Sequence, residues 1–144
     1  MVTIQRVMTV GRPAETVFGY LADFANTNEW DPGTVRTTRL DGDGGVGTTY
    51  RNISRFAGRE TELVYTVDEL TAPQRLRFRG VNKTVTARDT ITLRPVTAGE
   101  TELTYLAEFE FHGVARVVAP FMGRQFAKLG DEAAERLREV LGNL

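Results

Sequence analysis

The chain has 144 residues, of which 41% are hydrophobic and 26% are charged, with a formal net charge of -1 and no cysteine. This length fits one domain with a single core or cavity, and the charge provides no general attraction to nucleic-acid phosphates. Without cysteine, disulfides, a thiolate zinc site and a cysteine nucleophile are excluded.

No apolar run approaches the roughly 20 residues that span a bilayer, and the N-terminus lacks the basic and apolar regions of a signal peptide. We therefore expect one domain over residues 1–144 in the cytoplasm, with no stable membrane insertion and no nucleic-acid partner.

The first segment, residues 2–10, is predicted to be a strand. Its apolar side chains recur with a period of two, as they do on one face of a strand: Val2, Ile4, Met8 and Val10. Arg6 falls in this same apolar phase and interrupts it with a charge. The fold must therefore provide a partner, or water, for a cation on the inner side of this strand.

Two short helices are predicted next. Pro13 suits the first turn of a helix that extends to Asp23, and the apolar stripe of this helix has the expected spacing: Val17, Phe18, Leu21 and Phe24. Asn26 and Glu29 resemble a capping box for one further turn, which Pro32 ends.

Alternating segments then predict six strands, at residues 34–40, 46–56, 59–70, 74–81, 84–94 and 102–112. Their short connections are suited to hairpins, so consecutive strands should pair antiparallel. Arg75, Arg77 and Arg79 alternate along one strand and share one face. We expect them to pair with acidic side chains of flanking strands on a solvated face of the sheet.

The C-terminal segment predicts a helix of about six turns that begins near Pro120 and ends at Gly142. Its apolar side chains fall three or four residues apart: Met122, Phe126, Leu129, Ala133, Leu137, Val140 and Leu141. A long helix with one apolar stripe must lie across a long apolar surface, and the curved sheet is the only candidate. The fold class is therefore α+β.

The inward phase of the predicted strands contains more polar side chains than a dry core would hold: Thr37, Arg39, Thr48, Tyr50, Asn52, Ser54, Tyr65, Asp89 and Tyr105. Burying a hydroxyl or amide group without a partner costs roughly 1–3 kcal/mol. These residues therefore indicate internal water, internal partners or a ligand. An apolar chamber with a few convergent polar groups is the general form of a small-molecule site.

Asp89 is the most specific candidate, because its neighbours in the inward phase are all apolar. We predict Arg6 as its partner, since the last strand should close against the first, and Tyr105 as a hydrogen-bond donor. A functional interpretation is that this cluster orients the polar end of an apolar ligand. The alternatives are a structural ion pair, or an Arg6 that sits at the sheet margin with its charge in water.

The candidate ligand-binding residues are Trp30, Tyr50, Asn52, Tyr65, Phe78, Asp89, Ile91, Tyr105, Phe109, Met122 and Phe126. Simple packing is the alternative for the aromatic and methionine side chains. Gly123 and Gly130 are expected to leave room above the sheet. His112, the only histidine, is expected to be exposed at a strand end, and the chain contains no metal-ligand pattern.

The order of these elements, with the segments PAETVFGYLADF (13–24), EWDP (29–32) and TARDTITLRPVTAGETELTY (86–105), resembles the helix-grip (SRPBCC) superfamily. This superfamily includes START lipid-transfer domains, pollen-allergen-type proteins and bacterial aromatase/cyclases, and the bacterial polyketide cyclase/dehydrase-like branch is the most similar. The resemblance covers essentially the whole chain. It implies a curved sheet of seven strands that grips the C-terminal helix, with a lipophilic ligand held between them.

Three functions follow from these observations. The first is the binding or transport of a hydrophobic small molecule such as a lipid, polyketide or isoprenoid, with no cofactor and no metal. The second, drawn from the resemblance, is a cyclase or dehydratase in which Asp89, Arg6 and Tyr105 supply acid-base and enolate-stabilising groups. The third is a stress-related role in protein interaction, which a large exposed apolar patch without an internal void would favour.

Overall fold

The computed structural model describes all residues, 1–144. Its seven strands form one antiparallel sheet in the order β1-β7-β6-β5-β4-β3-β2. The strands are β1 Val2–Val10, β2 Thr34–Asp41, β3 Thr49–Phe56, β4 Arg59–Thr71, β5 Arg75–Val81, β6 Val85–Thr97 and β7 Glu100–Phe111. Each predicted strand is confirmed to within a few residues, and the first strand pairs with the last, as expected.

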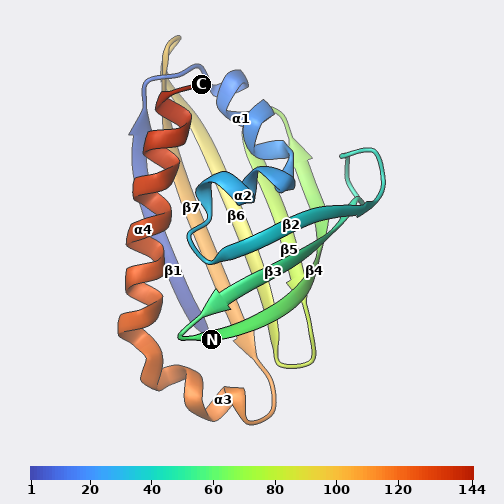
Figure 1. Ribbon diagram of the computed structural model, residues 1–144. Helices are drawn as coiled ribbons and strands as arrows, with labels where there is room; N and C mark the ends of the chain where they lie inside the picture. Colours follow the sequence, from blue (N-terminus) through green and yellow to red (C-terminus); the bar gives the residue numbers. More distant parts are fainter.

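The helices occupy two parts of the chain. Between β1 and β2 lie α1 Ala14–Ala22, the 3-10 turn η1 Phe24–Asn26, and α2 Thr27–Trp30. After β7 come α3 Ala115–Val118, the 3-10 turn η2 Ala119–Met122, and α4 Gly123–Gly142. In Figure 1, α4 runs alongside β1 while β2 and β3 curve across the same side of the sheet. This is the α+β helix-grip arrangement, and it places the core between α4 and the bent sheet.

The predicted capping box at the start of α2 was wrong. Asn26 has helical backbone angles and its side chain caps nothing; instead its Nδ2 donates to the carbonyl oxygen of Tyr20 at 2.7 Å. Glu29 accepts a hydrogen bond from the Tyr20 hydroxyl at 2.5 Å. The cap belongs to Asp23, which accepts from the amide of Ala25 at 3.0 Å because η1 begins there and leads directly into α2.

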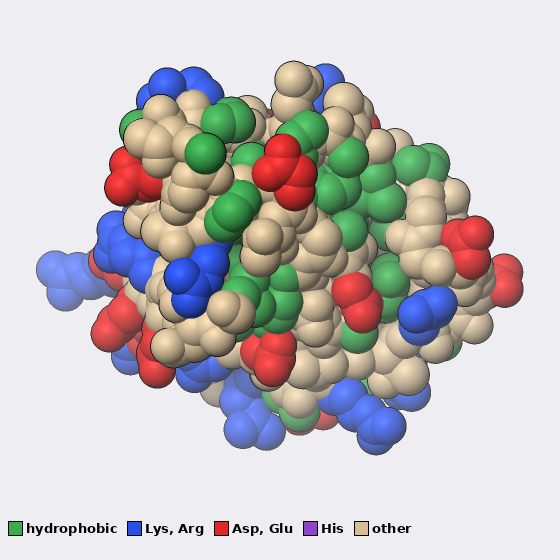
Figure 2. All heavy atoms as spheres, turned by 90° about the horizontal axis from the view of Figure 1, so that it is seen from above, with side chains coloured by type: hydrophobic (Ala, Val, Ile, Leu, Met, Phe, Trp, Pro, Cys, Tyr) green, Lys and Arg blue, Asp and Glu red, His purple; other side chains and the backbone are tan.

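The outer face of the sheet is charged and solvated. Arg79 pairs with Asp68 at 3.1 Å and Arg75 with Glu69 at 2.8 Å, as expected for cross-strand pairs. Exposed pairs of this kind contribute little to stability, because water screens their charges. At the end of the molecule where the C-terminus lies, cationic and anionic side chains also alternate around hydrophobic ones (Figure 2).

Candidate functional site

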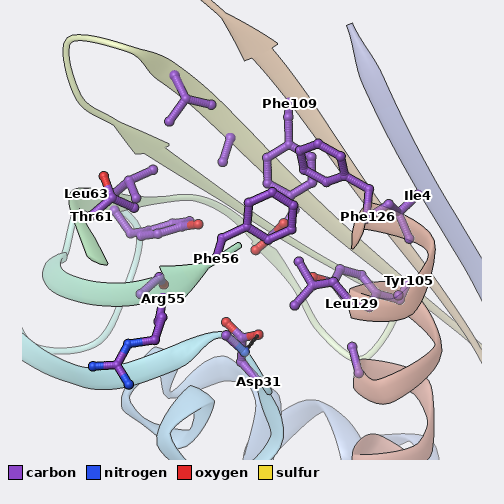
Figure 3. A pocket seen from close by; sticks show the side chains of 18 of the residues that line it. Ile4, Asp31, Arg55, Phe56, Thr61, Leu63, Tyr105, Phe109, Phe126 and Leu129 are labelled. Carbon is purple, nitrogen blue, oxygen red and sulfur yellow. Dashed lines mark hydrogen bonds between the residues drawn. The ribbon is translucent and has the colours of Figure 1, made fainter. Parts of the chain in front are cut away.

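A cavity of about 130 Å³ lies between the sheet and α4. The segment after α2 and the end of β3 contribute to one side of it, and Figure 3 shows the side chains that project into it. Apolar residues predominate in its wall: Ile4, Phe56, Leu63, Tyr65, Val85, Ala87, Tyr105, Phe109, Phe111, Phe126, Leu129 and Ala133. The space between α4 and the bent sheet is therefore not completely filled by side chains.

Three polar side chains in this wall have no hydrogen-bond partner within the protein. Asp89, in the middle of β6, is only 8% exposed and forms neither a hydrogen bond nor an ion pair. The hydroxyl groups of Tyr65 on β4 and Tyr105 on β7 are also without partners. Buried polar groups are almost always hydrogen-bonded, so these three groups are available to a molecule inside the cavity.

Asp31 provides a second carboxylate at the same cavity. It follows α2, and its two oxygens accept hydrogen bonds from the Gly33 amide at 3.2 Å and the Thr34 hydroxyl at 2.7 Å. Asp31 was not among the candidate residues, because it is far from Asp89 in the chain and shares no motif with it. Only the presence of Asp31 in the EWDP segment pointed to this position.

The surroundings of these groups disfavour negative charge. Burial raises the pKa of Asp89 to about 8, and the charge of Asp31 adds to this effect. Burial also raises the pKa of Asp31, although the hydrogen bonds from Thr34 and Gly33 partly oppose the shift. At neutral pH the Asp89 carboxyl group is therefore protonated, and it can donate a hydrogen bond.

The predicted pairing of Arg6 with Asp89 was wrong. The Arg6 Nε donates to Asp131 at 2.9 Å, and its two Nη atoms donate to the carbonyl oxygens of Ala127 and Gln5 at 3.1 and 2.8 Å. Arg6 lies on the edge strand β1 beneath α4, which supplies a carboxylate and a carbonyl close to water. The alternative position at the sheet margin is the one that the structure shows, because it avoids desolvating the cation.

Among the candidate ligand-binding residues, Tyr65, Asp89, Tyr105, Phe109 and Phe126 line the cavity. Trp30, Tyr50, Phe78 and Ile91 are instead buried in the core, and Met122 packs against its edge. Around Phe24, the rings of Tyr50 and Phe78 lie at centroid distances of 5.6 and 4.8 Å. Tyr50 and Phe78 therefore pack beneath the helices between β1 and β2, whereas the Trp30 ring lies edge-on to the cavity-lining Tyr105, with centroids 5.6 Å apart.

Asn52 belongs to a buried hydrogen-bond network. Its Nδ2 donates to the hydroxyl groups of Thr37 at 2.8 Å and Thr34 at 3.1 Å, and its Oδ1 accepts from Ser54 at 2.5 Å. The Thr37 hydroxyl also lies 2.6 Å from that of Thr27. Asn52 therefore connects β3 to β2 and α2 and is saturated by internal partners, which explains its burial without a ligand.

Aromatic side chains reduce the size of the cavity at one end. Phe126 of α4 packs against Phe56, Phe109 and Phe111, with ring centroids 4.5, 5.4 and 5.8 Å apart. Ligand pockets commonly measure about 300–1,000 Å³, whereas an apolar cavity of about 150 Å³ accepts benzene. In this conformation the cavity, at about 130 Å³, is close to the size that holds one small ring.

A route to solvent passes between β3 and α4. A surface hollow shares Gly33, Arg55, Phe56 and Leu129 with the cavity. Phe56 and Leu129 come from the end of β3 and from α4 (Figure 3), and both are partly exposed. These two side chains therefore separate the cavity from the surface hollow.

The expected role of Gly130 was also wrong, because it does not leave room above the sheet. A Cβ atom at this position would lie 2.5 Å from Cγ2 of Ile4 and 3.0 Å from the Arg6 guanidinium. Gly130 thus lets α4 approach β1 closely. A Cβ atom at Gly123, by contrast, would have no neighbouring atom within 4 Å.

The chain was then compared with known proteins. The family model described as "Polyketide cyclase / dehydrase and lipid transport" matches residues 1–142. The chain belongs to this family. A search of curated proteins found no match.

Solved structures show the same fold at low identity. The aromatase/cyclase Zhui from Streptomyces sp. R1128 is 19% identical, with a TM-score of 0.73 and coverage of 96% of this chain and 95% of that chain. A START superfamily protein from Mycobacterium smegmatis is 14% identical, with a TM-score of 0.78 and coverage of 98% and 97%. A norcoclaurine synthase point mutant from Thalictrum, complexed with a transition-state analogue, is 16% identical, with a TM-score of 0.67 and coverage of 97% and 93%.

No group of three or more His, Cys, Asp or Glu side chains is placed to hold a metal ion. No helix combines the length and the apolar character needed to cross a membrane. The exposed side chain of His112 lies 3.1 Å from the hydroxyl group of Thr86 at the end of the sheet.

Proposed function

We propose that this protein binds a compact, largely apolar molecule that carries one hydrogen-bond acceptor, in the cavity beneath α4. The observation that supports this most directly is Asp89, which is buried, faces the cavity and has no protein partner. Tyr65 and Tyr105 add two further hydroxyl groups to the same space. The polar group of the ligand would contact these three residues, while Phe109 and Phe126 would pack against its apolar part.

The chemistry of the wall favours a carbonyl group as the acceptor. Because the pKa of Asp89 is raised to about 8, Asp89 and the two tyrosines all present O–H donors at neutral pH. A ketone or aldehyde oxygen can accept from such donors without bringing a charge into the cavity. The volume of about 130 Å³ fits one ring, and a lipid, polyketide or isoprenoid would require Phe56 and Leu129 to move apart.

A matched pair of probes tests the polar contact. Acetophenone and ethylbenzene have nearly the same size, but only acetophenone has a carbonyl oxygen. Titration calorimetry at pH 6 should show binding of both, with acetophenone preferred by about tenfold, equivalent to one net hydrogen bond. Native mass spectrometry of the purified protein should also detect a co-purifying apolar molecule.

Two variants locate this preference in the cavity. Asp89→Ala should reduce the preference for acetophenone several-fold, whereas Arg6→Gln should leave it unchanged because Arg6 pairs with Asp131 outside the cavity. A failure of the protein to bind either probe or to retain any apolar passenger would contradict the proposal. Equal effects of the two variants would contradict the role of Asp89.

One observation favours a second function, the acid-catalysed dehydration of a β-hydroxy ketone. A carboxyl group with a pKa near 8 can both donate and accept a proton close to neutral pH. In this reaction a proton leaves the carbon next to the ketone, the C–O bond of the hydroxyl group breaks, and the hydroxide leaves as water after protonation. No oxidant or cofactor is needed. Tyr105 would stabilise the enol oxygen, and the second acid-base group would be Asp31.

4-Hydroxy-2-butanone is small enough to test this reaction. Its conversion to methyl vinyl ketone and water can be followed by ultraviolet absorbance. The protein would be shown to be an enzyme if it converts this ketone faster than buffer alone and if Asp89→Ala abolishes the excess rate. If acetophenone binds but 4-hydroxy-2-butanone is not turned over, the function is binding alone. A large exposed apolar patch without an internal void would have favoured the protein-interaction role, and this protein has an internal cavity.

A further inference from the structure

The segment between β7 and α4 exposes an apolar face that no other part of the chain covers. Val114, Val117, Val118 and Phe121 are 82%, 69%, 49% and 86% exposed. They occupy positions i, i+3, i+4 and i+7, so in a helical segment they project from one side. In Figure 1, α3 lies at the end of the molecule opposite the C-terminus, projecting beyond the sheet. Contiguous exposed apolar side chains of this kind mark interaction surfaces.

The charged side chains within this segment are all cationic, although Glu110, which pairs with Arg88, shares a surface hollow with Arg116. Residues 111–130 contain Arg116, Arg124 and Lys128 but no aspartate or glutamate, although the whole chain has a net charge of -1. Arg116 and Arg124 are exposed, and neither forms an ion pair. The surface therefore combines apolar anchors with free cations and fits a partner that is apolar and anionic.

A second copy of the chain fits this surface poorly. A twofold contact through the apolar face would bring the same patch of both copies together. Arg116 and Arg124 would then lie opposite the same unpaired cations of the other copy, and like charges across an interface oppose association.

The surface of an anionic bilayer satisfies both features. The valine side chains and Phe121 can enter the region between headgroups and acyl chains, as the apolar faces of interfacial helices do. Arg116 and Arg124 can meanwhile contact anionic headgroups, which attract cations near the surface. No helix is suited to cross the membrane, so this contact is peripheral.

We propose that residues 114–124 dock this protein onto an anionic membrane surface. Phe111 and Phe126, which flank this segment in the sequence, line the internal cavity. Docking therefore brings the aromatic end of the cavity next to the bilayer, where apolar molecules are dissolved. The proposal does not depend on which molecule the cavity accepts.

Vesicle flotation tests the docking surface with the full chain. Vesicles of phosphatidylcholine with 30% phosphatidylglycerol should retain the protein at low ionic strength, and vesicles of phosphatidylcholine alone should retain much less. Val117→Ser/Phe121→Ser should lower the bound fraction at least tenfold. Arg116→Glu/Arg124→Glu should abolish the difference between the two kinds of vesicle, and added salt should act in the same direction.

The matched control is Leu40→Ser/Val46→Ser, which also replaces two exposed apolar side chains, 53% and 65% exposed, elsewhere on the molecule. This control should bind like the unmodified protein. An equal loss in control and test variants would overturn the proposal, as would a complete lack of binding to anionic vesicles. Analytical ultracentrifugation tests self-association. If the unmodified protein is a dimer and Val117→Ser/Phe121→Ser is a monomer, the apolar face is a dimer interface and the membrane proposal is overturned.

Discussion

Asp31 and Asp89 face the same cavity, although one follows the short helix α2 and the other lies in the middle of β6. Asp31 is held by hydrogen bonds from Gly33 and Thr34, whereas Asp89 has no partner in the protein. Burial and the charge of Asp31 together raise the pKa of Asp89 to about 8. The two carboxyl groups thus differ in their partners, and the one that lacks a partner in the protein is mainly neutral at pH 7.

This relationship predicts an unusual dependence of stability on pH. The pKa of Asp89 rises from its ordinary value of 3.8 to about 8 on folding, so the folded protein binds the extra proton between these values. The corresponding stabilisation is complete below about pH 4, decreases as the pH rises, and is lost above about pH 8. The free energy of unfolding should therefore fall by a few kcal/mol across this range.

Urea unfolding at pH 5, 7 and 8.5 measures this effect. Asp89→Asn should flatten the dependence and should be more stable than the unmodified protein at pH 8.5, because no charge has to be buried. Asp41→Asn, which alters an exposed carboxylate at the end of β2, should leave the slope unchanged. If the free energy of unfolding depends on pH equally in the unmodified protein and in Asp89→Asn, Asp89 does not cause the pH dependence.

Asn52 should affect stability without affecting the ligand site. It is 2% exposed, and its side chain is satisfied by Thr34, Thr37 and Ser54. Asn52→Ala leaves these hydroxyl groups, of which that of Thr37 is buried, with fewer partners, and we expect a loss of about 2–3 kcal/mol in the free energy of unfolding. Acetophenone affinity, measured under conditions where the variant is fully folded, should remain unchanged. A loss of acetophenone affinity in the folded variant would show instead that Asn52 contributes to ligand binding.

Gly130 and Gly123 offer a matched test of how closely α4 approaches β1. Gly130→Ala places a methyl group 2.5 Å from Cγ2 of Ile4, so we expect destabilisation of about 1–3 kcal/mol despite the better helix propensity of alanine. Gly123→Ala meets no neighbouring atom and should stabilise the same helix by up to about 1 kcal/mol. Thermal unfolding gives both values, and shifts of the same sign would contradict the close packing.

Phe56 should control the size of ligand that enters. Phe56→Ala removes one of the two side chains that separate the cavity from the surface hollow, together with the packing of Phe56 against Phe126. We expect the affinity for 2-acetonaphthone, which has two fused rings, to rise about tenfold relative to acetophenone, at a stability cost of roughly 1–3 kcal/mol. Calorimetric titration with both ketones measures this ratio. Leu40→Ala, on the exposed side of β2, is the control, and an unchanged ratio in Phe56→Ala would place the entrance elsewhere.

The sequence determined the elements and their layers because these depend on local periodicity. The alternation in residues 34–112 and the helical spacing after Pro120 required strands and an amphipathic helix, and the short turns required antiparallel neighbours. The inward position of Asp89 followed from the same alternation, since a strand with one buried face leaves no choice of phase.

Only the tertiary structure decided how side chains from distant segments combine. Arg6 joined Asp131 because α4 lies directly over β1, a closeness that Gly130 permits. Asp31 reached the cavity because α2 turns the chain towards the sheet, which no spacing in the sequence records. The volume of the cavity likewise depends on how Phe56 and Phe126 pack against each other. Periodicity fixes which face a side chain occupies, whereas contacts between elements depend on helix position and close packing, which are properties of the whole fold.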